Sequence, residues 1–137
     1  MPDPRLLAPL PLMAALMGAL TLTTPAQATD AASLQAGYSA QAGAPADAAR
    51  GQRLFTTTQG GQWSCASCHN AAPTQAGRHA STGKSIAALA PAFNPERFTD
   101  AAKAEKWFRR NCKDVLSREC SAAEKADVMA WLITLKP

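Results

Sequence analysis

Two cysteines and a histidine stand close together near the middle of the chain, in the stretch SCASCHN at residues 64–70. Cys65, Cys68 and His69 form the pattern C-x-x-C-H, which is typical of a covalently attached c-type haem. Two thiols three residues apart lie on one helical turn and can bond the same porphyrin, and the imidazole that follows is carried under the iron. The motif therefore predicts haem c, with His69 as one axial ligand.

The same motif has two other interpretations. A C-x-x-C pair can be a thiol redox site, but such sites usually belong to a βαβ unit, and no segment of this chain alternates convincingly as a strand. It can also be an ordinary pair of thiols beside a surface histidine. A segment typical of export precedes the motif, which favours haem. The second ring nitrogen of His69 then needs an acceptor, and the backbone carbonyl of Pro73 is one candidate.

The ligand on the other face of the iron is less obvious. Electron-transfer cytochromes c commonly use methionine. Met129 is the only methionine after residue 28, and its position inside the expected last helix suits core packing better. His79 is the only other histidine and lies in a glycine-bounded loop, where we expect a surface or propionate-binding role. Lys84 and Arg78 are further candidates for the propionates.

An asparagine is the third candidate. Apolar residues recur at helical spacing after residue 100: Ala104, Trp107, Phe108 and Val115. Asn111 falls in the middle of this stripe, four residues from Trp107 and four from Val115. An amide on an apolar face needs a partner, because leaving it without one costs about 1–3 kcal/mol. A nearby carbonyl or a helix cap would be an ordinary partner, and the iron would be a more specific one.

Tryptophans flank both candidate ligands. Trp63 leads directly into the haem motif, and Trp107 lies on the apolar stripe with Asn111. We expect both indole rings to contact the cofactor, since aromatic side chains contribute large apolar surfaces to a core.

Two cysteines remain outside the motif, Cys112 and Cys120. In an exported chain such a pair tends to form a disulfide. The loop it would close is short, and the loop-entropy estimate for its stabilisation is about 2.5 kcal/mol. Two free thiols are an alternative. A four-cysteine zinc site is another, although structural zinc sites usually have a second C-x-x-C or a histidine pair. A disulfide beside Asn111 would hold that residue in place.

The first 28 residues have the layout of a secretory signal peptide. Arg5 precedes a mostly apolar run, and Ala26-Gln27-Ala28 is a small-x-small cleavage site. A membrane anchor is the alternative, but the apolar run is about 17 residues long, near the short limit for a span, and two prolines interrupt it. We therefore expect cleavage after Ala28 and a periplasmic protein.

The rest of the chain is long enough for one small domain. We expect an N-terminal helix or a linker at residues 29–45 and a haem domain at residues 46–137. The chain has 14 Lys and Arg against 10 Asp and Glu, a net charge of +4. This mild excess suggests an acidic redox partner at most. The basic residues are scattered without interleaved aromatics, which excludes a nucleic-acid-binding surface.

Start and stop signals predict an all-α fold with four or five helices and long loops. Helices are expected at about 31–42 and 47–55, and from a cap at Thr99 or Asp100 to about residue 115. The last helix follows Ser121 and Glu124, which form the capping-box pattern S-x-x-E. Gly51 lies within an expected helix, where it is tolerable if another backbone comes close.

Several of these segments together resemble the sphaeroides haem protein (SHP) family. They are CASCH at residues 65–69, GRHA at 77–80, NPERFTD at 94–100, and KWFRRNCKDVL at 106–116 with Cys120. The resemblance covers roughly residues 51–135 and departs from the family at none of the key positions. The stretch before it matches only weakly.

The resemblance implies a class I-like cytochrome c fold around one covalently bound haem, with a disulfide between Cys112 and Cys120. It implies His69 as the proximal ligand and Asn111 as the distal ligand of the oxidised protein. In the family the asparagine leaves on reduction, and the ferrous haem binds O2 or NO. Dihaem c-type and membrane b-type cytochromes are implied as electron donors.

Two other functions stay open at this point. The chain is also compatible with a plain electron carrier that is six-coordinate in both redox states, or with a reductase of O2 or NO. A peroxidase normally needs a distal acid-base pair, and only His79 could contribute to one. We expect a ligand-binding and electron-transfer haem protein rather than a dedicated enzyme.

Overall fold

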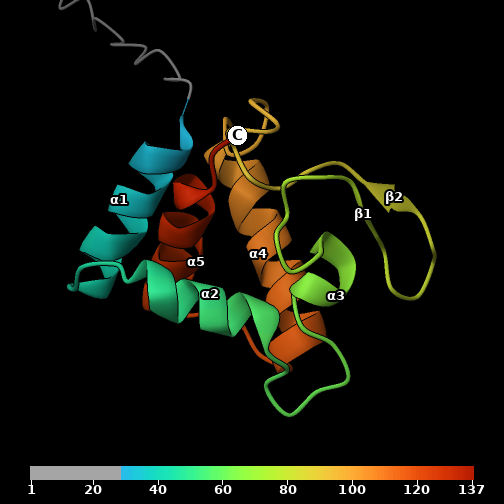
Figure 1. Ribbon diagram of the computed structural model, residues 1–137. Helices are drawn as coiled ribbons and strands as arrows, with labels where there is room; N and C mark the ends of the chain where they lie inside the picture. Colours follow the sequence, from blue (N-terminus) through green and yellow to red (C-terminus); the bar gives the residue numbers. More distant parts are fainter. Residues whose placement is uncertain (1–28) are drawn as a thin grey trace, which may run out of the picture.

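The computed structural model describes residues 29–137, so the expected signal peptide lies outside the described residues. The described part consists of five helices and one short antiparallel sheet (Figure 1). The helices are α1 (Ala31–Ala42), α2 (Ala48–Thr56), α3 (Ala66–His69), α4 (Ala101–Leu116) and α5 (Ala122–Thr134), and the strands are β1 (Gly77–Arg78) and β2 (Ser85–Ile86). No helix in this range is both long and apolar enough to cross a membrane.

Local capping signals account for where the helices begin. The side chains of Asp30, Asp47 and Asp100 each accept a hydrogen bond from the backbone N–H three residues later. Ser121 and Glu124 form both bonds of the predicted capping box at the start of α5. The four helices predicted outside the haem motif are therefore confirmed to within one or two residues.

The strands were not expected from the sequence. Only two residue pairs are involved, Gly77 with Ile86 and Arg78 with Ser85, which is too short for an alternating pattern. Gly77 packs directly on the C-x-x-C-H motif, because a Cβ at this position would lie 2.0 Å from the Cys68 carbonyl oxygen. The base of the hairpin thus packs against the motif.

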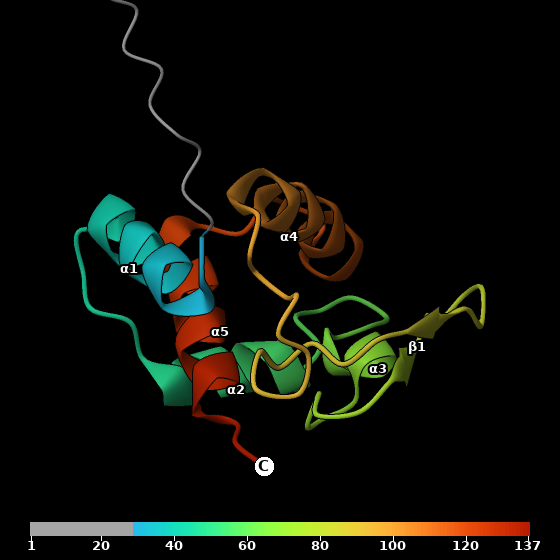
Figure 2. The ribbon, with the colours of Figure 1, turned by 90° about the horizontal axis from the view of Figure 1, so that it is seen from above.

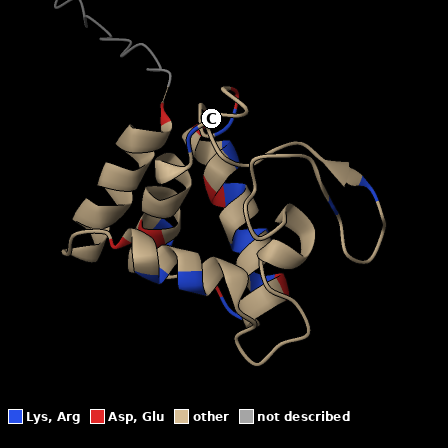
Figure 3. Ribbon diagram, viewed as in Figure 1, with Lys and Arg blue, Asp and Glu red and all other residues tan. Residues whose placement is uncertain are grey.

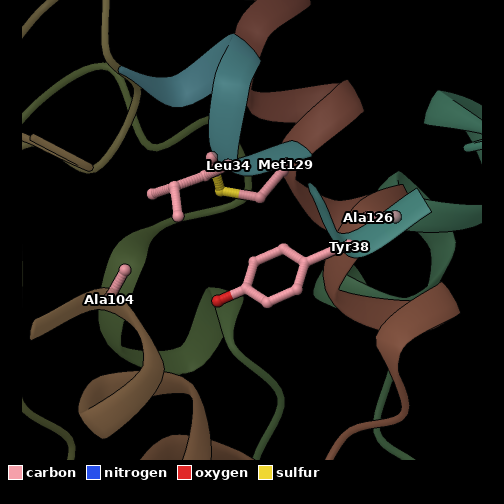
Figure 4. Close-up of a cluster of buried hydrophobic side chains, with 5 residues drawn as sticks. All are labelled: Leu34, Tyr38, Ala104, Ala126 and Met129. Atoms are coloured by element: carbon pink, nitrogen blue, oxygen red, sulfur yellow. The ribbon is translucent and has the colours of Figure 1, made fainter. Parts of the chain in front are cut away.

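One part of the core joins α1, α4 and α5. Its buried residues are Leu34, Tyr38, Ala104, Ala126 and Met129 (Figure 4). Met129 is fully buried in this cluster and does not line the cavity that contains His69. The prediction that Met129 fills the core is confirmed.

The other part of the core joins α2 and α5, with Phe55, Val128, Trp131 and Leu132 buried together. The two helices cross in close contact (Figures 1 and 2). A Cβ on Gly51 would lie only 2.0 Å from the carbonyl oxygen of Asp127, so glycine is what permits the crossing.

Two ionic clusters fix α5 against its neighbours. Buried Asp127 of α5 is bonded to the guanidinium of Arg50 on α2. On the other side of α5, Glu105 of α4 accepts hydrogen bonds from Lys125 Nζ at 2.6 Å and from the Tyr38 hydroxyl at 3.0 Å. Burial and the bond to Glu105 raise the pKa of Tyr38. The second cluster ties α4 to both α1 and α5.

Candidate haem site

A cavity of about 520 Å³ is lined by residues of α4, the α3 motif and the loops around the hairpin. Its volume is in the range of cofactor pockets, roughly 300–1,000 Å³. Apolar side chains dominate its walls: Leu54, Phe55, Ile86, Leu89, Phe98, Phe108, Val115, Leu116, Val128 and Leu132. Cys65, Cys68 and His69 enter from the α3 segment, and Asn111 enters from α4. The structure therefore brings the predicted haem-site residues to one cavity.

A single helical turn arranges the haem motif. The backbone N–H groups of Cys68 and His69 both donate to the Cys65 carbonyl, which forms the turn. The Cys68 sulfur accepts a hydrogen bond from the backbone N–H of Ala80, at 3.2 Å. Cys65 and Cys68 are not bonded to each other. Two thiols on one turn face the cavity wall, as covalent attachment to one porphyrin requires.

The chemistry of Cys65 does not suit a thiol redox site. Burial raises the pKa of the Cys65 thiol to about 11. A nucleophilic C-x-x-C cysteine needs the opposite shift, since the thiolate is the reactive form.

His69 is held in its neutral form. Burial, followed by the electrostatic effects of Arg97 and His79, lowers the pKa of His69 to about 4. A neutral imidazole has the lone pair that a metal ion needs. The Pro73 carbonyl, a candidate acceptor for the ring of His69, instead accepts from the backbone N–H groups of Leu89 and Ala90, both at 3.0 Å.

Asn111 lies on the apolar stripe of α4, which lines the cavity as expected. Asn111 is half-buried and its amide makes no hydrogen bond with another described residue, so neither of the ordinary partners considered for it is observed. The cap of α4 is Ser117 instead. The Asn111 amide is thus available to bind a group inside the cavity.

The Cys112–Cys120 disulfide is present, with a Cα–Cα distance of 5.6 Å. Because zinc is bound by free thiolates, neither sulfur of this disulfide can be a zinc ligand. In residues 29–137, no group of three or more His, Cys, Asp or Glu side chains is arranged to hold a metal ion. The zinc alternative is therefore wrong for the described chain.

Both predicted tryptophans line the cavity. Trp63 is half-buried beside the motif. Trp107 is 43% exposed, and the guanidinium of Arg110 lies 5.7 Å from its ring centroid. A large apolar ring that remains this exposed at a cavity wall suits a site that receives an apolar cofactor.

Of the three residues considered for binding the haem propionates, two line the cavity and one does not. His79 and Lys84 line the cavity, whereas Arg78 does not and donates to the Gly83 carbonyl at 2.8 Å. The Nδ1 atom of His79 accepts from the Thr82 N–H, at 3.3 Å.

Arg97 is a cavity residue that the sequence reasoning did not identify as a site residue. It lies 28 positions after His69, and only its place in the NPERFTD segment drew attention to it. The sequence carries no spacing signal that connects the two.

Together these features fit a covalently held haem: apolar walls, two unbonded thiols on one turn, a neutral imidazole and an amide without a partner. Comparisons with known proteins point the same way. Residues 41–132 match the family model of a domain of unknown function, DUF1924. The cytochrome c-type protein SHP of Cereibacter sphaeroides is 55% identical over 108 residues, which is 76% of this chain and 83% of the relative. The chain belongs to the SHP family of c-type cytochromes.

Solved structures agree with this assignment. The SHP-family chain superposes on oxidised SHP, an oxygen-binding cytochrome c, with a TM-score of 0.74 and 53% identity over 79% of this chain and 99% of that one. Cytochrome c'' of Methylophilus methylotrophus is 45% identical over 82 residues, which are 60% of this chain and 57% of the relative. Its solution structure gives a TM-score of 0.67 at 35% identity, covering 78% of this chain and 94% of that one.

The predicted all-α, cytochrome c-like fold with one disulfide is therefore confirmed. Cytochromes of the c type hold haem covalently, so the cofactor of this SHP-family protein is haem c. Cys65 and Cys68 are the two cysteines of the described chain that are not in a disulfide, and both line the cavity.

Proposed function

We propose that this chain is a periplasmic monohaem cytochrome c in which His69 and Asn111 bind the oxidised iron. Asn111 leaves when the iron is reduced, which opens a position for O2 or NO. The haem supplies the redox change and the binding of the gas. The observation that carries the proposal is the Asn111 amide, which lines the same cavity as His69 and has no other partner among the described residues.

The residues of the α3 turn anchor the cofactor. Cys65 and Cys68 would form the two thioether bonds, and the neutral imidazole of His69 would be the permanent ligand. Gly77 packs closely against the Cys68 carbonyl, and the centroids of the Phe55 and His69 rings lie 6.2 Å apart, so this side of the site has packed neighbours.

Asn111 is suited to be an axial ligand that detaches from the iron and binds it again. Its amide oxygen is neutral, hard and weakly donating, so it should hold ferric iron better than the softer ferrous iron. The adjacent Cys112 is bonded to Cys120, and α4 is tied to α1 and α5 through Glu105. The backbone of Asn111 therefore stays in place while its side chain moves.

The related proteins support this behaviour. SHP is described as an oxygen-binding cytochrome c in its oxidised structure, and the solution structure of cytochrome c'' bears on haem-ligand detachment. A weakly bound axial amide is what we expect in a family whose members bind a ligand and also release one.

Dihaem c-type and membrane b-type cytochromes are the electron donors that we propose. Lys and Arg residues outnumber Asp and Glu residues along α4, the helix that carries Asn111 (Figure 3). A basic helix beside the cofactor would steer an acidic redox partner toward it, with a rate that falls as salt increases.

Absorption spectra in both redox states, with and without carbon monoxide, test the proposal. We expect a reduced protein that is high-spin and binds carbon monoxide rapidly. Asn111→Ala should remove the low-spin ferric species and keep carbon monoxide binding. Lys106→Ala, an exposed change on the same helix, is the matched control and should leave both spectra unchanged. A reduced protein that stays low-spin and refuses carbon monoxide would make the chain a plain electron carrier.

A further inference from the structure

Apart from the effect of Arg97 on the pKa of His69, the segment from Asn94 to Asp100 has no part in the chemistry of the haem site, yet it makes a dense set of side-chain contacts. Asn94 Nδ2 donates to the Ala88 carbonyl at 3.2 Å. Arg97 donates from Nε to the same carbonyl at 2.9 Å and from Nη2 to the Ala87 carbonyl at 2.8 Å. These bonds close the segment onto residues 87–88.

This arrangement is continuous with the loop behind the haem motif. Leu89 and Ala90, which follow directly, donate their backbone N–H groups to the Pro73 carbonyl, four residues after His69. Arg97 is thus positioned by backbone groups that are themselves fixed to the loop that follows His69.

The backbone beside Arg97 is strained. Phe98 has a φ of 65°, in the left-handed region that residues other than glycine rarely adopt. Such a conformation is unfavourable for a residue with a side chain and persists where surrounding contacts hold it. Phe98 packs against both clusters of the core, and Arg97 and Phe98 both line the cavity. Core packing of Phe98 therefore fixes where its neighbour lies.

The guanidinium of Arg97 keeps donors to spare. An arginine guanidinium has five N–H groups in a planar fork. Two of the five are used by the Ala87 and Ala88 carbonyls. A fixed cation with unused donors at the wall of an apolar cavity is suited to a carboxylate that the cavity receives.

We propose that Arg97 binds a propionate carboxylate of the haem and raises the reduction potential of the iron. A positive charge near the metal favours the state with the lower positive charge, which is the reduced state. Other cations on the cavity wall are less constrained: Lys84 and Lys103 are exposed, and Arg110 lies over the Trp107 ring. This inference rests on the haem site proposed above.

The variant Arg97→Gln in the holoprotein tests the proposed contact between Arg97 and a propionate, with Arg78→Gln as the matched control. The control removes the same charge from a nearby arginine that is outside the cavity and donates to Gly83. Haem content is measured first. We expect Arg97→Gln to shift the propionate bending band in the resonance Raman spectrum and to lower the reduction potential. Arg78→Gln should change neither, and Arg97→Lys should restore part of both.

Three results would overturn the assignment. The first is a haem-loaded Arg97→Gln protein with the propionate band of the wild type. The second is an equal fall in potential in both glutamine variants. If Arg97→Gln does not fold, wild-type holoprotein decides the matter by NMR: Overhauser contacts between Arg97 guanidinium protons and propionate methylenes are expected, and their absence after assignment would refute it. Wild-type protein without attached haem would instead refute the function proposed above.

Discussion

Cys112 on α4 is bonded to Cys120, and this bond fastens the turn that carries Asn111 to the residue just before the Ser121 cap of α5. An axial ligand that detaches must return to the same place. The disulfide and the capping box together give that turn a fixed backbone, while the neighbouring amide has no bond of its own to another described residue.

Replacing both cysteines by serine should therefore loosen the ligand as well as the fold. We expect Cys112→Ser with Cys120→Ser to reduce the low-spin fraction of the ferric spectrum. Loss of the short cross-linked loop should also cost about 2.5 kcal/mol of stability. Absorption spectra and urea unfolding measure the two effects separately. An unchanged ferric spectrum in a destabilised protein would show that the disulfide only staples the fold.

Glu105 on α4 accepts hydrogen bonds from Lys125 on α5 and from Tyr38 on α1. Glu105→Gln leaves the largely buried Lys125 ammonium without its counter-ion, and we expect a loss of about 1–3 kcal/mol. The double change Glu105→Gln with Lys125→Met should cost less than the two single changes added together. Urea denaturation of the four proteins measures the coupling. Additive losses would mean that the pair does not interact in solution.

The carboxyl group of Glu105 also predicts how the folding stability of the protein depends on pH. Although burial opposes it, the hydrogen bonds from Lys125 and Tyr38 lower the pKa of Glu105 below its ordinary value of 4.5. A lowered folded pKa gives stability that is present above 4.5 and is lost as the pH falls through the folded value. Wild type should therefore lose stability on acidification below 4.5, and Glu105→Gln should lose less. Parallel curves for the two proteins would contradict this assignment.

Two helix glycines make a matched pair. A Cβ at Gly51 meets the Asp127 backbone at 2.0 Å, whereas one at Gly37 meets nothing within 4 Å. Gly51→Ala should force α2 from α5 and destabilise by about 1–3 kcal/mol. Gly37→Ala should stabilise α1 by about 0.5–1 kcal/mol, because alanine suits a helix interior better. Thermal unfolding compares them, and similar shifts for both would argue against the close crossing.

Met129 distinguishes core packing from iron ligation. Met129→Ala should cost about 2–5 kcal/mol, since the side chain is fully buried among Leu34 and Tyr38. Met129→Leu should cost less than about 1.5 kcal/mol. The ferric spectrum of the leucine variant should match wild type. A change of spin state in that variant would mean that the methionine reaches the iron.

Much of this protein can be predicted from short segments of its sequence. The C-x-x-C-H motif, the aspartate caps and the Ser121 capping box depend on neighbours within three or four residues, so sequence spacing alone specifies them. The position of Asn111 on an apolar stripe follows from the same helical periodicity. Gly51 was recognised as a possible close approach, although nothing in the sequence indicated that α5 would be the helix it meets.

Only the tertiary structure decided the rest. The bonds from Arg97 to the carbonyls of Ala87 and Ala88, the use of the Pro73 carbonyl by Leu89 and Ala90, and the placing of Gly77 on Cys68 join residues 9 to 17 positions apart. Asp127 and Glu105 find partners 20 to 80 positions away. Such contacts leave no periodic trace, because they depend on how helices and loops pack against one another rather than on the rise and turn of a single element.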